Sequence, residues 1–324
     1  METREGQRPH AIAQRWDPDA FKFAEPKRAA SADESADHAW LAKLQTEIAQ
    51  FDLTTHVAEL ELKGYTVIPP ERAAPAGFME RLRHGITELA ARRLGAAPDL
   101  AHGSNLSGAN GRGSTFNFAL LEGPIFEEAL MNPVVLAMAT SLLGYSCNLW
   151  LSAAALKPAD DVALTIHADN PPWQPDPWPA YAQVCNVTYA VSDYTVEGGC
   201  ICFVPGSHRL GRRPTPAEAR DYRNPALEPA TAAAGSLIVF HGNTWHGAFP
   251  RKNPGTRMSL ILAFNRMYIE AQEDYRDAVT DDMLARNAER FATLMRMRDP
   301  APYRQEGFHR RFTTMATAGR SLHA

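Results

Sequence analysis

The feature that most constrains the fold is a change in the sequence pattern after Gly144. From there to about residue 267 the chain carries short strand-like segments separated by turns rich in Gly, Pro and Asn. None of these segments is followed by a helical pattern, so a parallel sheet of β-α-β units is excluded. Short strands with irregular connections are typical of an antiparallel sandwich or jelly roll. The strands expected in this region are 146–157, 162–168, 181–191, 200–204, 236–240, 244–249 and 256–267, and an earlier short strand is expected at 65–68.

Helical patterns flank this β region on both sides. Apolar residues spaced by three or four predict helices within 37–63 and 75–94. Shorter helical runs follow near 125–131 and 133–143, and a last helix is expected at about 279–297. The fold class that we expect is therefore mainly β with flanking helices, the helices packing on one face of the sheets.

The same patterns give the expected organisation of the chain. Residues 1–37 mix charges, Ala and Pro without a period and are predicted to be a mobile arm. One domain is expected over 38–300, and a basic tail over 301–324. Within the domain we expect a helical portion (38–144), a β core (145–270) and a C-terminal helix (271–300).

Composition excludes several classes of function. The chain has 324 residues, 33 Lys and Arg against 37 Asp and Glu, and a formal net charge of −4, which disfavours a nucleic-acid binder. No run reaches the length of a membrane span, and the N-terminal residues lack the apolar core of a secretory signal. The four cysteines fit reduced core thiols. We therefore expect a cytoplasmic protein whose partner is a small molecule.

His167 and Asp169 stand two residues apart in a segment predicted to be a strand. Residues i and i+2 of a strand share one face, so the imidazole and the carboxylate would project together as adjacent metal ligands. Alone, the pair is a weak signal, because a chain of this composition contains such a pair by chance. A solvated pair at a strand end is the alternative interpretation.

Later residues strengthen the metal hypothesis. His246 lies on a short predicted strand after a Gly-Asn turn. Arg257 follows in an apolar strand, where a buried guanidinium is costly unless it meets an anion such as a carboxylate. Ser259 would face the same way and add a hydroxyl donor. Two histidines and one carboxylate form the facial triad of non-haem Fe(II) sites, which leaves coordination positions open for chemistry.

Together with the segment 197–208 (Glu-Gly-Gly-Cys-Ile-Cys-Phe-Val-Pro-Gly-Ser-His), these residues resemble the phytanoyl-CoA dioxygenase family. The Gly-Gly and Val-Pro-Gly-Ser-His phrases are the most distinctive part, and the resemblance covers about residues 50–270. It implies a double-stranded β-helix, which is a cupin-like jelly roll, with Fe(II) as the metal, 2-oxoglutarate as the cosubstrate and O2 as the oxidant.

The resemblance also implies roles for individual residues. His167, Asp169 and His246 are expected to be the iron ligands, and Arg257 and Ser259 are expected to bind the distal carboxylate of 2-oxoglutarate. The implied reaction hydroxylates an unactivated C–H bond and releases succinate and CO2. Asp169 argues against halogenation, because related halogenases have Gly or Ala at that position.

Four further residues are candidates for the pocket. Asn186, in the middle of a predicted strand, is expected to reach the oxoacid. Trp173 and Trp178 lie in a stiff, Pro-rich segment directly after Asp169 and are candidates to shape the substrate pocket. Lys157, at the end of a predicted strand, is a third candidate for substrate binding.

The predicted function is hydroxylation of a small, rather apolar molecule such as an acyl-CoA, a terpenoid or another natural product. With the same cofactors, desaturation, epoxidation or ring formation stays open, because the pose of the substrate decides the outcome. A jelly-roll binding module without catalysis is an alternative from another class. A cupin-like metal enzyme without an oxoacid is a further one, although the Arg-x-Ser pattern at 257–259 speaks against it.

Overall fold

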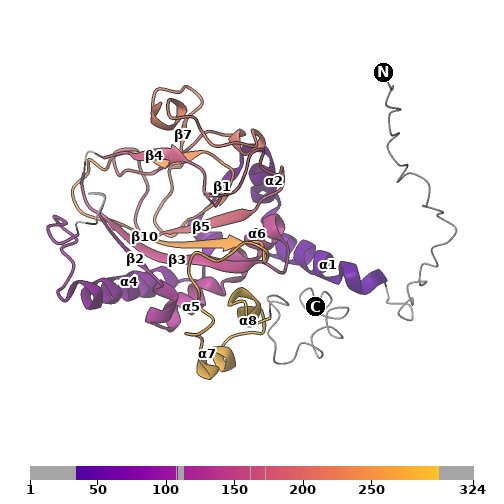
Figure 1. The fold of residues 1–324 in the computed structure, drawn as a ribbon. Coiled ribbons are helices and arrows are strands. Elements are labelled where there is room, and N and C mark those ends of the chain that lie inside the picture. Colours follow the sequence, from indigo (N-terminus) through magenta and orange to yellow (C-terminus); the bar gives the residue numbers. More distant parts are fainter. Residues whose placement is uncertain (1–33, 107, 109–112, 161, 172, 299–324) are drawn as a thin grey trace, which may run out of the picture.

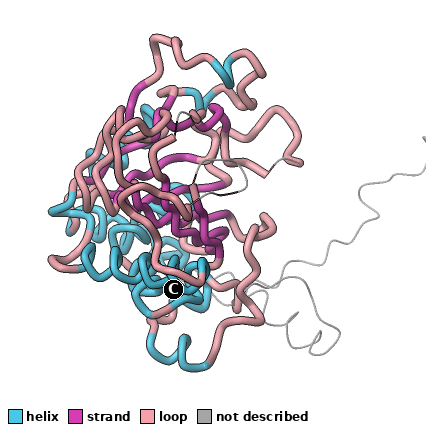
Figure 2. Tube along the Cα trace, turned by 90° about the vertical axis from the view of Figure 1, so that its left-hand side faces the viewer, coloured by secondary structure: helices cyan, strands magenta, loops and turns pink. Residues whose placement is uncertain are grey.

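The computed structural model describes residues 34–298, apart from 107, 109–112, 161 and 172. Two antiparallel sheets lie one above the other, and helices cover the outer face of the lower sheet (Figure 1). Figure 2 shows the same layers from the side, with most of the helices gathered below the strands. This arrangement confirms the predicted fold class.

The larger sheet has six strands in the order β1-β8-β5-β10-β3-β2. Its central strand β10 pairs with β5 on one side and with β3 on the other. The bounds are β1 Tyr65–Ile68, β2 Ser114–Asn117, β3 Asn148–Lys157, β5 Val184–Ala190, β8 Leu237–His241 and β10 Arg257–Asn265.

The smaller sheet has four strands in the order β4-β9-β6-β7. Its strands are short, and β9 pairs with β4 on one side and with β6 on the other. The bounds are β4 Leu164–His167, β6 Ile201–Phe203, β7 Glu228–Pro229 and β9 His246–Ala248.

Most helices precede the β core, as the sequence predicts. They are α1 Glu34–Gln50, α2 Thr54–Lys63, α3 Pro70–Ala73, α4 Phe78–Leu94, α5 Pro124–Leu130 and α6 Pro133–Leu143. Short 3-10 turns lie at Ala119–Glu122, Ser207–Arg209 and Glu218–Arg220, and α7 Asp281–Arg286 and α8 Arg290–Leu294 close the described chain.

Three expectations differ from the structure. Helix α1 begins at Glu34, inside the segment predicted as an arm; the rest of that arm and the whole tail 301–324 lie outside the described residues. The single C-terminal helix is wrong, because the chain leaves the helix at Asn287, whose amide donates to Met283 O and to the buried Glu127. Strands β2 and β7 are missing from the prediction, because neither has an alternating apolar pattern of its own.

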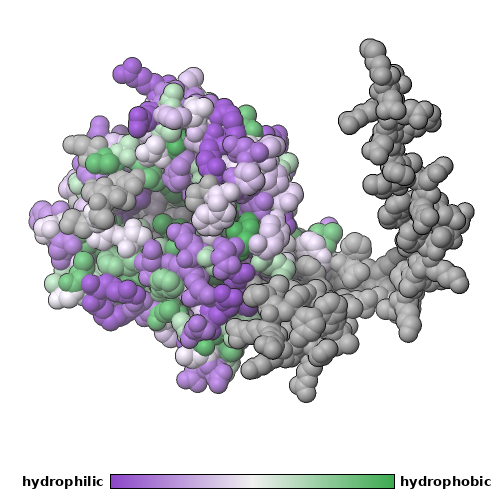
Figure 3. All heavy atoms as spheres, viewed as in Figure 1, coloured by the Kyte–Doolittle hydropathy of each residue, from purple (hydrophilic) through white to green (hydrophobic). Residues whose placement is uncertain are grey.

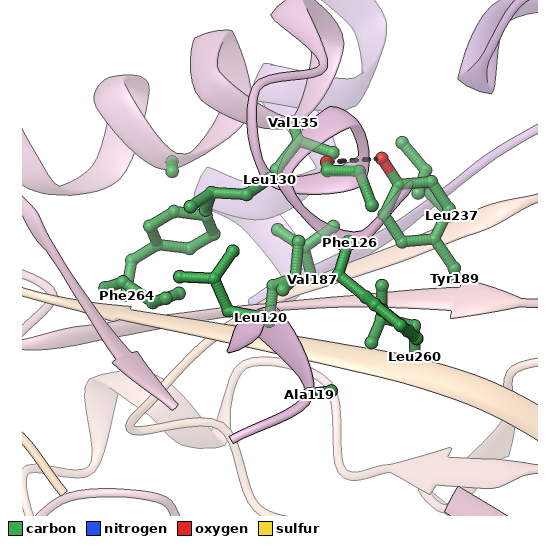
Figure 4. Packing of buried hydrophobic residues seen from close by; sticks show 14 of the residues in the cluster. Ala119, Leu120, Phe126, Leu130, Val135, Val187, Tyr189, Leu237, Leu260 and Phe264 are labelled. Carbon is green, nitrogen blue, oxygen red and sulfur yellow. Dashed lines mark hydrogen bonds between the residues drawn. The ribbon is translucent and has the colours of Figure 1, made fainter. Parts of the chain in front are cut away.

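The main hydrophobic core lies between the helices and the larger sheet. Along β10, Met258, Leu260, Leu262 and Phe264 all belong to this core, and residues of α5 and α6 pack onto them (Figure 4). The Tyr189 hydroxyl of β5 donates to Ala129 O at 2.8 Å, which satisfies the one polar atom of this buried side chain. The helices therefore fix the larger sheet from its outer face.

Because side chains alternate along a strand, the other residues of the larger sheet face the smaller sheet. On β10 these are Arg257, Ser259, Ile261 and Ala263, and on β5 they include Asn186. On β10 and β5 this inner face carries the polar side chains, whereas on β1 and β8 it carries the large apolar side chains of Tyr65, Ile238 and Phe240. The space for a site is therefore between the two sheets.

Among the described residues, no single helix is long and apolar enough to span a membrane. Helices α5 and α6, bent by 48° at their junction, meet that test of length and composition only as a pair.

The turn between α2 and β1 packs closely against the loop that leads into β9. Gly64 ends α2 with φ 85°, and its carbonyl accepts from the Thr244 hydroxyl at 2.9 Å. A Cβ on Gly64 would lie 2.3 Å from Thr244 Oγ1 and 2.6 Å from His208 Nδ1. Both the backbone conformation and the available space therefore require glycine here.

We expect Gly64→Ala to lower the free energy of unfolding by about 3 kcal/mol, because left-handed strain and overpacking add. Gly95→Ala is the matched control: Gly95 also ends a helix with positive φ (70°), but nothing lies within 4 Å of its added Cβ. That variant should lose only about 1 kcal/mol. Urea unfolding measures both values, and equal losses would show that the close approach at Gly64 has no energetic effect.

Candidate metal centre

The two histidines of the predicted triad lie opposite each other on neighbouring strands. His167 at the end of β4 pairs in register with His246 at the start of β9, and the two ring centroids are 4.3 Å apart. Strand pairing therefore brings together two side chains that are far apart in the sequence. The His246 side chain is 6% exposed and that of His167 is 40% exposed, so the pair reaches from the interior towards solvent.

Both rings are oriented by a backbone carbonyl. His167 Nδ1 lies 2.8 Å from Thr165 O, and His246 Nδ1 lies 3.0 Å from Thr244 O. A carbonyl oxygen only accepts, so Nδ1 of each ring carries the hydrogen and donates it. In the neutral rings Nε2 is then left as the lone-pair atom, which is the arrangement of a metal-ligating histidine.

Asp169 completes the cluster from the loop after β4. Its backbone N–H donates to Gly242 O at 2.9 Å, which ties this loop to the turn after β8. Its carboxylate oxygens lie 3.3 Å from His167 Nε2 and 3.4 Å from His246 Nε2. Burial raises the pKa of the Asp169 carboxyl, whereas positive charge beside it, from protonated His246 and His167 or from a metal ion between them, holds that pKa well below its usual range.

These three ligand atoms are arranged to hold a cation between them. With Nδ1 protonated, each Nε2 presents a lone pair to a carboxylate that has only lone pairs to offer. Two ligand atoms held at right angles about 2.1 Å from one ion would lie about 3 Å apart. The observed 3.3 and 3.4 Å are close to that separation. Two imidazoles and one carboxylate are the donor set of a facial triad, so the residues fit a divalent iron ion.

Aromatic rings line the inner side of the cluster. The Phe240 ring of β8 lies 4.6 Å from the His246 ring, centroid to centroid, and the Phe203 ring of β6 lies 6.0 Å from it. Phe203 in turn stacks on Tyr65 at 4.2 Å. These rings exclude water from the His246 side of the site, which strengthens electrostatic interactions there.

Arg257 faces the interior from the first position of β10. Its guanidinium donates to Gly199 O and lies over the ring of Tyr194, 4.5 Å from the ring centroid. Its Nε is buried and has no hydrogen-bond partner among the described residues. A buried donor without a partner is unfavourable in a protein interior, so this group is suited to an anionic ligand.

A cavity of about 380 Å³ lies next to Arg257, between the two sheets. Leu164 and Ala248 line it from β4 and β9, and the same two strands carry His167 and His246 further along. The other residues that line the cavity are Gly108, Gly113, Ser114, Thr115, Ala155, Leu156, Lys157, Arg257 and Ile261.

On the face of the molecule shown in Figure 3, hydrophilic residues predominate and apolar ones form only small patches among the residues described.

Lys157 stands opposite Arg257 in the pairing of β3 with β10. Its ammonium lies 3.2 Å from Phe249 O and 3.6 Å from the carboxylate of Asp160. The structure thus places the predicted substrate residue Lys157 in the wall of the cavity, beside the predicted cosubstrate residue. Positive charge at this end exceeds the single negative charge of Asp160.

The structure also brings Ser259 and Asn186 to the inner face of the larger sheet. Ser259 is 1% exposed and lies two residues along β10 from Arg257. Asn186 is 3% exposed and pairs in register with Phe240, the residue whose ring contacts His246. Its Nδ2 is a buried donor without a partner among the described residues. Asn186 is therefore ready to donate a hydrogen bond to a ligand.

The two tryptophans after Asp169 are placed differently from each other. Trp173 is 73% exposed, whereas Trp178 is 4% exposed. Trp178 packs beneath Arg213, whose guanidinium also donates to Pro171 O at 2.7 Å. Neither ring is found among the described residues that line the cavity beside Arg257.

Two other histidines lie close in sequence to the ligands but outside the cluster. His208 and His241 have ring centroids 5.3 Å apart, and both are buried. Burial lowers the pKa of His208 and, together with His208 and Arg266, lowers that of His241 to about 3. Both rings are therefore neutral near pH 7. Within the described part of the chain, only the triad brings three potential ligands together.

Facing antiparallel sheets with a His–Asp–His cluster between them define a jelly roll with a candidate metal site. A family model described as phytanoyl-CoA dioxygenase (PhyH) matches residues 60–259. The chain therefore belongs to the phytanoyl-CoA dioxygenase family. This confirms the family predicted from the sequence and agrees with the predicted enzyme class and cofactors.

Curated relatives include several named dioxygenases. Dioxygenase aneA of Aspergillus aculeatus is 27% identical over 161 residues, which is 47% of this chain and 53% of that protein. Ectoine dioxygenase of Bordetella parapertussis is 24% identical over 183 residues, which is 49% of this chain and 59% of that protein. The chain thus spans about half the length of these relatives.

Solved structures of similar fold support the jelly-roll assignment. HygX from Streptomyces hygroscopicus, solved with nickel and 2-oxoglutarate bound, has a TM-score of 0.54 at 17% identity, covering 72% of this chain and 94% of its own. The carbocyclase SnoK from nogalamycin biosynthesis has a TM-score of 0.52 at 20% identity, covering 72% of this chain and 90% of its own. At this identity the likeness shows the fold alone.

Sequence reasoning missed two residues that organise the site. Tyr194 lies under Arg257, and Asn243 accepts from Asn170 Nδ2 at 2.6 Å and donates to Pro179 O at 3.1 Å, which holds the loop after Asp169. A signal existed for both: Tyr194 closely precedes the Glu-Gly-Gly segment, and Asn243 sits in the Gly-Asn turn before His246. Neither residue type by itself indicates a role.

Proposed function

We propose that this protein is an Fe(II)- and 2-oxoglutarate-dependent dioxygenase that hydroxylates a C–H bond of a small organic molecule. The observation that carries the proposal is the convergence of His167, Asp169 and His246, with both Nε2 atoms near the carboxylate oxygens. A cation site alone would not specify an oxygenase. The interior guanidinium of Arg257, in a cavity reached along the same strands, adds a place for an oxoacid.

The triad would hold iron, and iron bound with 2-oxoglutarate supplies the activation of O2 for C–H oxidation. The chain's own residues orient and protect this centre. The carbonyls of Thr165 and Thr244 keep both imidazoles in the ligating tautomer. The rings of Phe240 and Phe203 keep water from the His246 side of the site. Exclusion of water limits side reactions that would consume O2 and 2-oxoglutarate without oxidising the substrate.

For the cosubstrate, we assign the distal carboxylate of 2-oxoglutarate to Arg257 and Ser259. A guanidinium with a buried, unpartnered Nε suits a carboxylate, and the Ser259 position shares its face of the strand. Lys157 adds positive charge to the same wall. Asn186 is proposed to donate to an oxygen of the bound oxoacid, because its free amide lies beside Phe240 near the triad.

The substrate is proposed to be a small, rather apolar molecule of the acyl-CoA, terpenoid or other natural-product type. Relatives named as dioxygenases and a structural neighbour from nogalamycin biosynthesis support this range. Trp173 and Trp178 are proposed to shape the substrate side, Trp173 by direct contact and Trp178 through the loop that it anchors. The buried, free cysteines support a reducing, cytoplasmic setting.

Anaerobic titration tests the proposal directly. Adding 2-oxoglutarate to the Fe(II)-loaded protein should produce a weak visible charge-transfer band, because both ligands meet at one centre. Fe(II) or 2-oxoglutarate alone should give none. On admitting O2, succinate release should follow, and a substrate screen should find compounds that stimulate it. A protein that binds Fe(II) but shows neither band nor succinate would instead be a metal-binding jelly roll.

A further inference from the structure

We propose that Tyr194 is a positioning residue for 2-oxoglutarate: its ring holds the Arg257 guanidinium in the plane that receives the distal carboxylate. This inference rests on the proposed function, in which Arg257 binds that carboxylate. It assigns part of the affinity for 2-oxoglutarate to an aromatic residue from a different segment of the chain.

Tyr194 is held in place by its own backbone. The residue is 1% exposed, and it forms an isolated antiparallel bridge with Ala232, in which each N–H donates to the other's carbonyl at 2.8 and 3.0 Å. The next residues form a tight turn, because Cys200 N–H donates to Thr195 O at 2.9 Å. Tyr194 and the carbonyl of Gly199 are therefore fixed relative to each other.

Arg257 is held between these two fixed points. One side of its guanidinium meets the carbonyl of Gly199, and its face lies over the ring of Tyr194 with Cζ 4.5 Å from the centroid. A hydrogen bond alone leaves the guanidinium free to rotate about it. A ring face adds the second constraint and fixes the plane, so that the buried Nε keeps one direction.

The charges at this end of the cavity explain why an aromatic ring is suited to orient the Arg257 guanidinium. Within the described part of the chain, no carboxylate forms an ion pair with Arg257, and its charged neighbours include Lys157 and Arg251. A carboxylate in place of Tyr194 would also orient the guanidinium, but it would neutralise the charge that the cosubstrate needs. A π face attracts the cation and leaves its hydrogen-bond donors available.

The alternative is that Tyr194 is a packing residue only. It does belong to the smaller hydrophobic cluster between the sheets, with Tyr65, Phe203 and Phe240. A packing role predicts that loss of the ring lowers stability and weakens all ligands together. A positioning role predicts a selective loss of affinity for oxoacids that carry a distal carboxylate.

The test compares Tyr194→Leu with Tyr194→Phe in the Fe(II)-loaded full-length protein under anaerobic conditions. We expect Tyr194→Leu to raise the Kd for 2-oxoglutarate about tenfold, because a desolvated cation–π contact is lost. Tyr194→Phe keeps the ring face and should stay within about twofold of wild type. For 2-oxobutanoate, which lacks the distal carboxylate, the Kd should be the same in all three proteins. The charge-transfer band gives each Kd without turnover.

Phe126→Leu is the control for general destabilisation, because it removes a buried ring from the helical core on the outer face of the larger sheet. Its Kd for 2-oxoglutarate should be that of wild type. Should Tyr194→Leu not fold, Tyr194→Met takes its place, because the flexible Met side chain adapts to irregular gaps and has no ring face.

The possible outcomes distinguish a failure of the proposed function from a failure of the role proposed for Tyr194. Absence of the band in wild type would overturn the proposed function itself. A normal band with unchanged 2-oxoglutarate affinity in Arg257→Ala would overturn the assignment of the clamp. If both hold, wild-type affinity in Tyr194→Leu, or an equal loss for 2-oxoglutarate and 2-oxobutanoate, would overturn the inference about Tyr194.

Discussion

Replacement of His246 by Ala is expected to abolish Fe(II) binding and 2-oxoglutarate turnover together. His246 is the most buried of the three ligands, and its Nε2 lies 3.4 Å from the Asp169 carboxylate. Without it the cluster keeps one imidazole and one carboxylate. We expect Fe(II) affinity to fall by more than about a hundredfold, because even the loss of a group that only supports a ligand costs ten- to a hundredfold. Competition with a chromogenic chelator measures the affinity.

His84→Ala is the matched control, because His84 is an exposed histidine paired with Glu88 on α4. It should bind iron as wild type does. Circular dichroism on His246→Ala checks that the strands persist, since the lost Nδ1 bond to Thr244 O is local. If His246→Ala released succinate at the wild-type rate, the assignment of His246 as a ligand would be wrong.

Arg257→Ala should separate cosubstrate binding from metal binding. Removal of the guanidinium, whose Nε is buried, leaves the distal carboxylate of 2-oxoglutarate without its charged partner. Truncation of one member of a buried charge pair costs about 2–5 kcal/mol, so the KM for 2-oxoglutarate should rise by about two orders of magnitude or more. Fe(II) affinity should change little. Succinate assays at varied 2-oxoglutarate measure the KM.

Arg81→Ala serves as the control for loss of an arginine, because Arg81 is exposed and pairs with Glu128 on the surface. Its KM should match that of wild type. Arg257→Lys should recover part of the loss, since it restores the charge but not the planar fork. An unchanged KM in Arg257→Ala would place the carboxylate elsewhere in the cavity.

Much of the β core could be predicted from the sequence, because its strands are set by local patterns. The alternation along 256–267 and the turn residues around it gave β10 nearly complete, Arg257–Asn265. The candidate ligands could be singled out for a similar reason: His167 and Asp169 are neighbours, and His246 ends a recognisable segment. The structure then added the register that places His167 opposite His246.

What the sequence does not contain is the set of contacts between distant segments. Gly199 and Arg257 are far apart in the chain, and no local pattern joins their backbone carbonyl and side chain. The interrupted C-terminal helix has the same origin, because Asn287 bonds to Glu127 of α5 across the tertiary structure. Trp173 and Trp178 show it too: they lie in the same stiff loop but differ in exposure, and the Arg213 that packs over Trp178 comes from a distant segment.

Alternate residues of strand β10 serve different purposes: one set forms the core under the helices, and the other set faces the smaller sheet. Its even-numbered residues, 258 to 264, belong to the core beneath the helices, while Arg257 and Ile261 on the opposite face line the cavity. An engineer can therefore change the shape of the cavity at Ile261 without altering a side chain of the helical layer, and can repack the core at Leu260 or Leu262 without altering a side chain of the cavity wall. Such independence allows a lineage to acquire new chemistry while the scaffold stays unchanged.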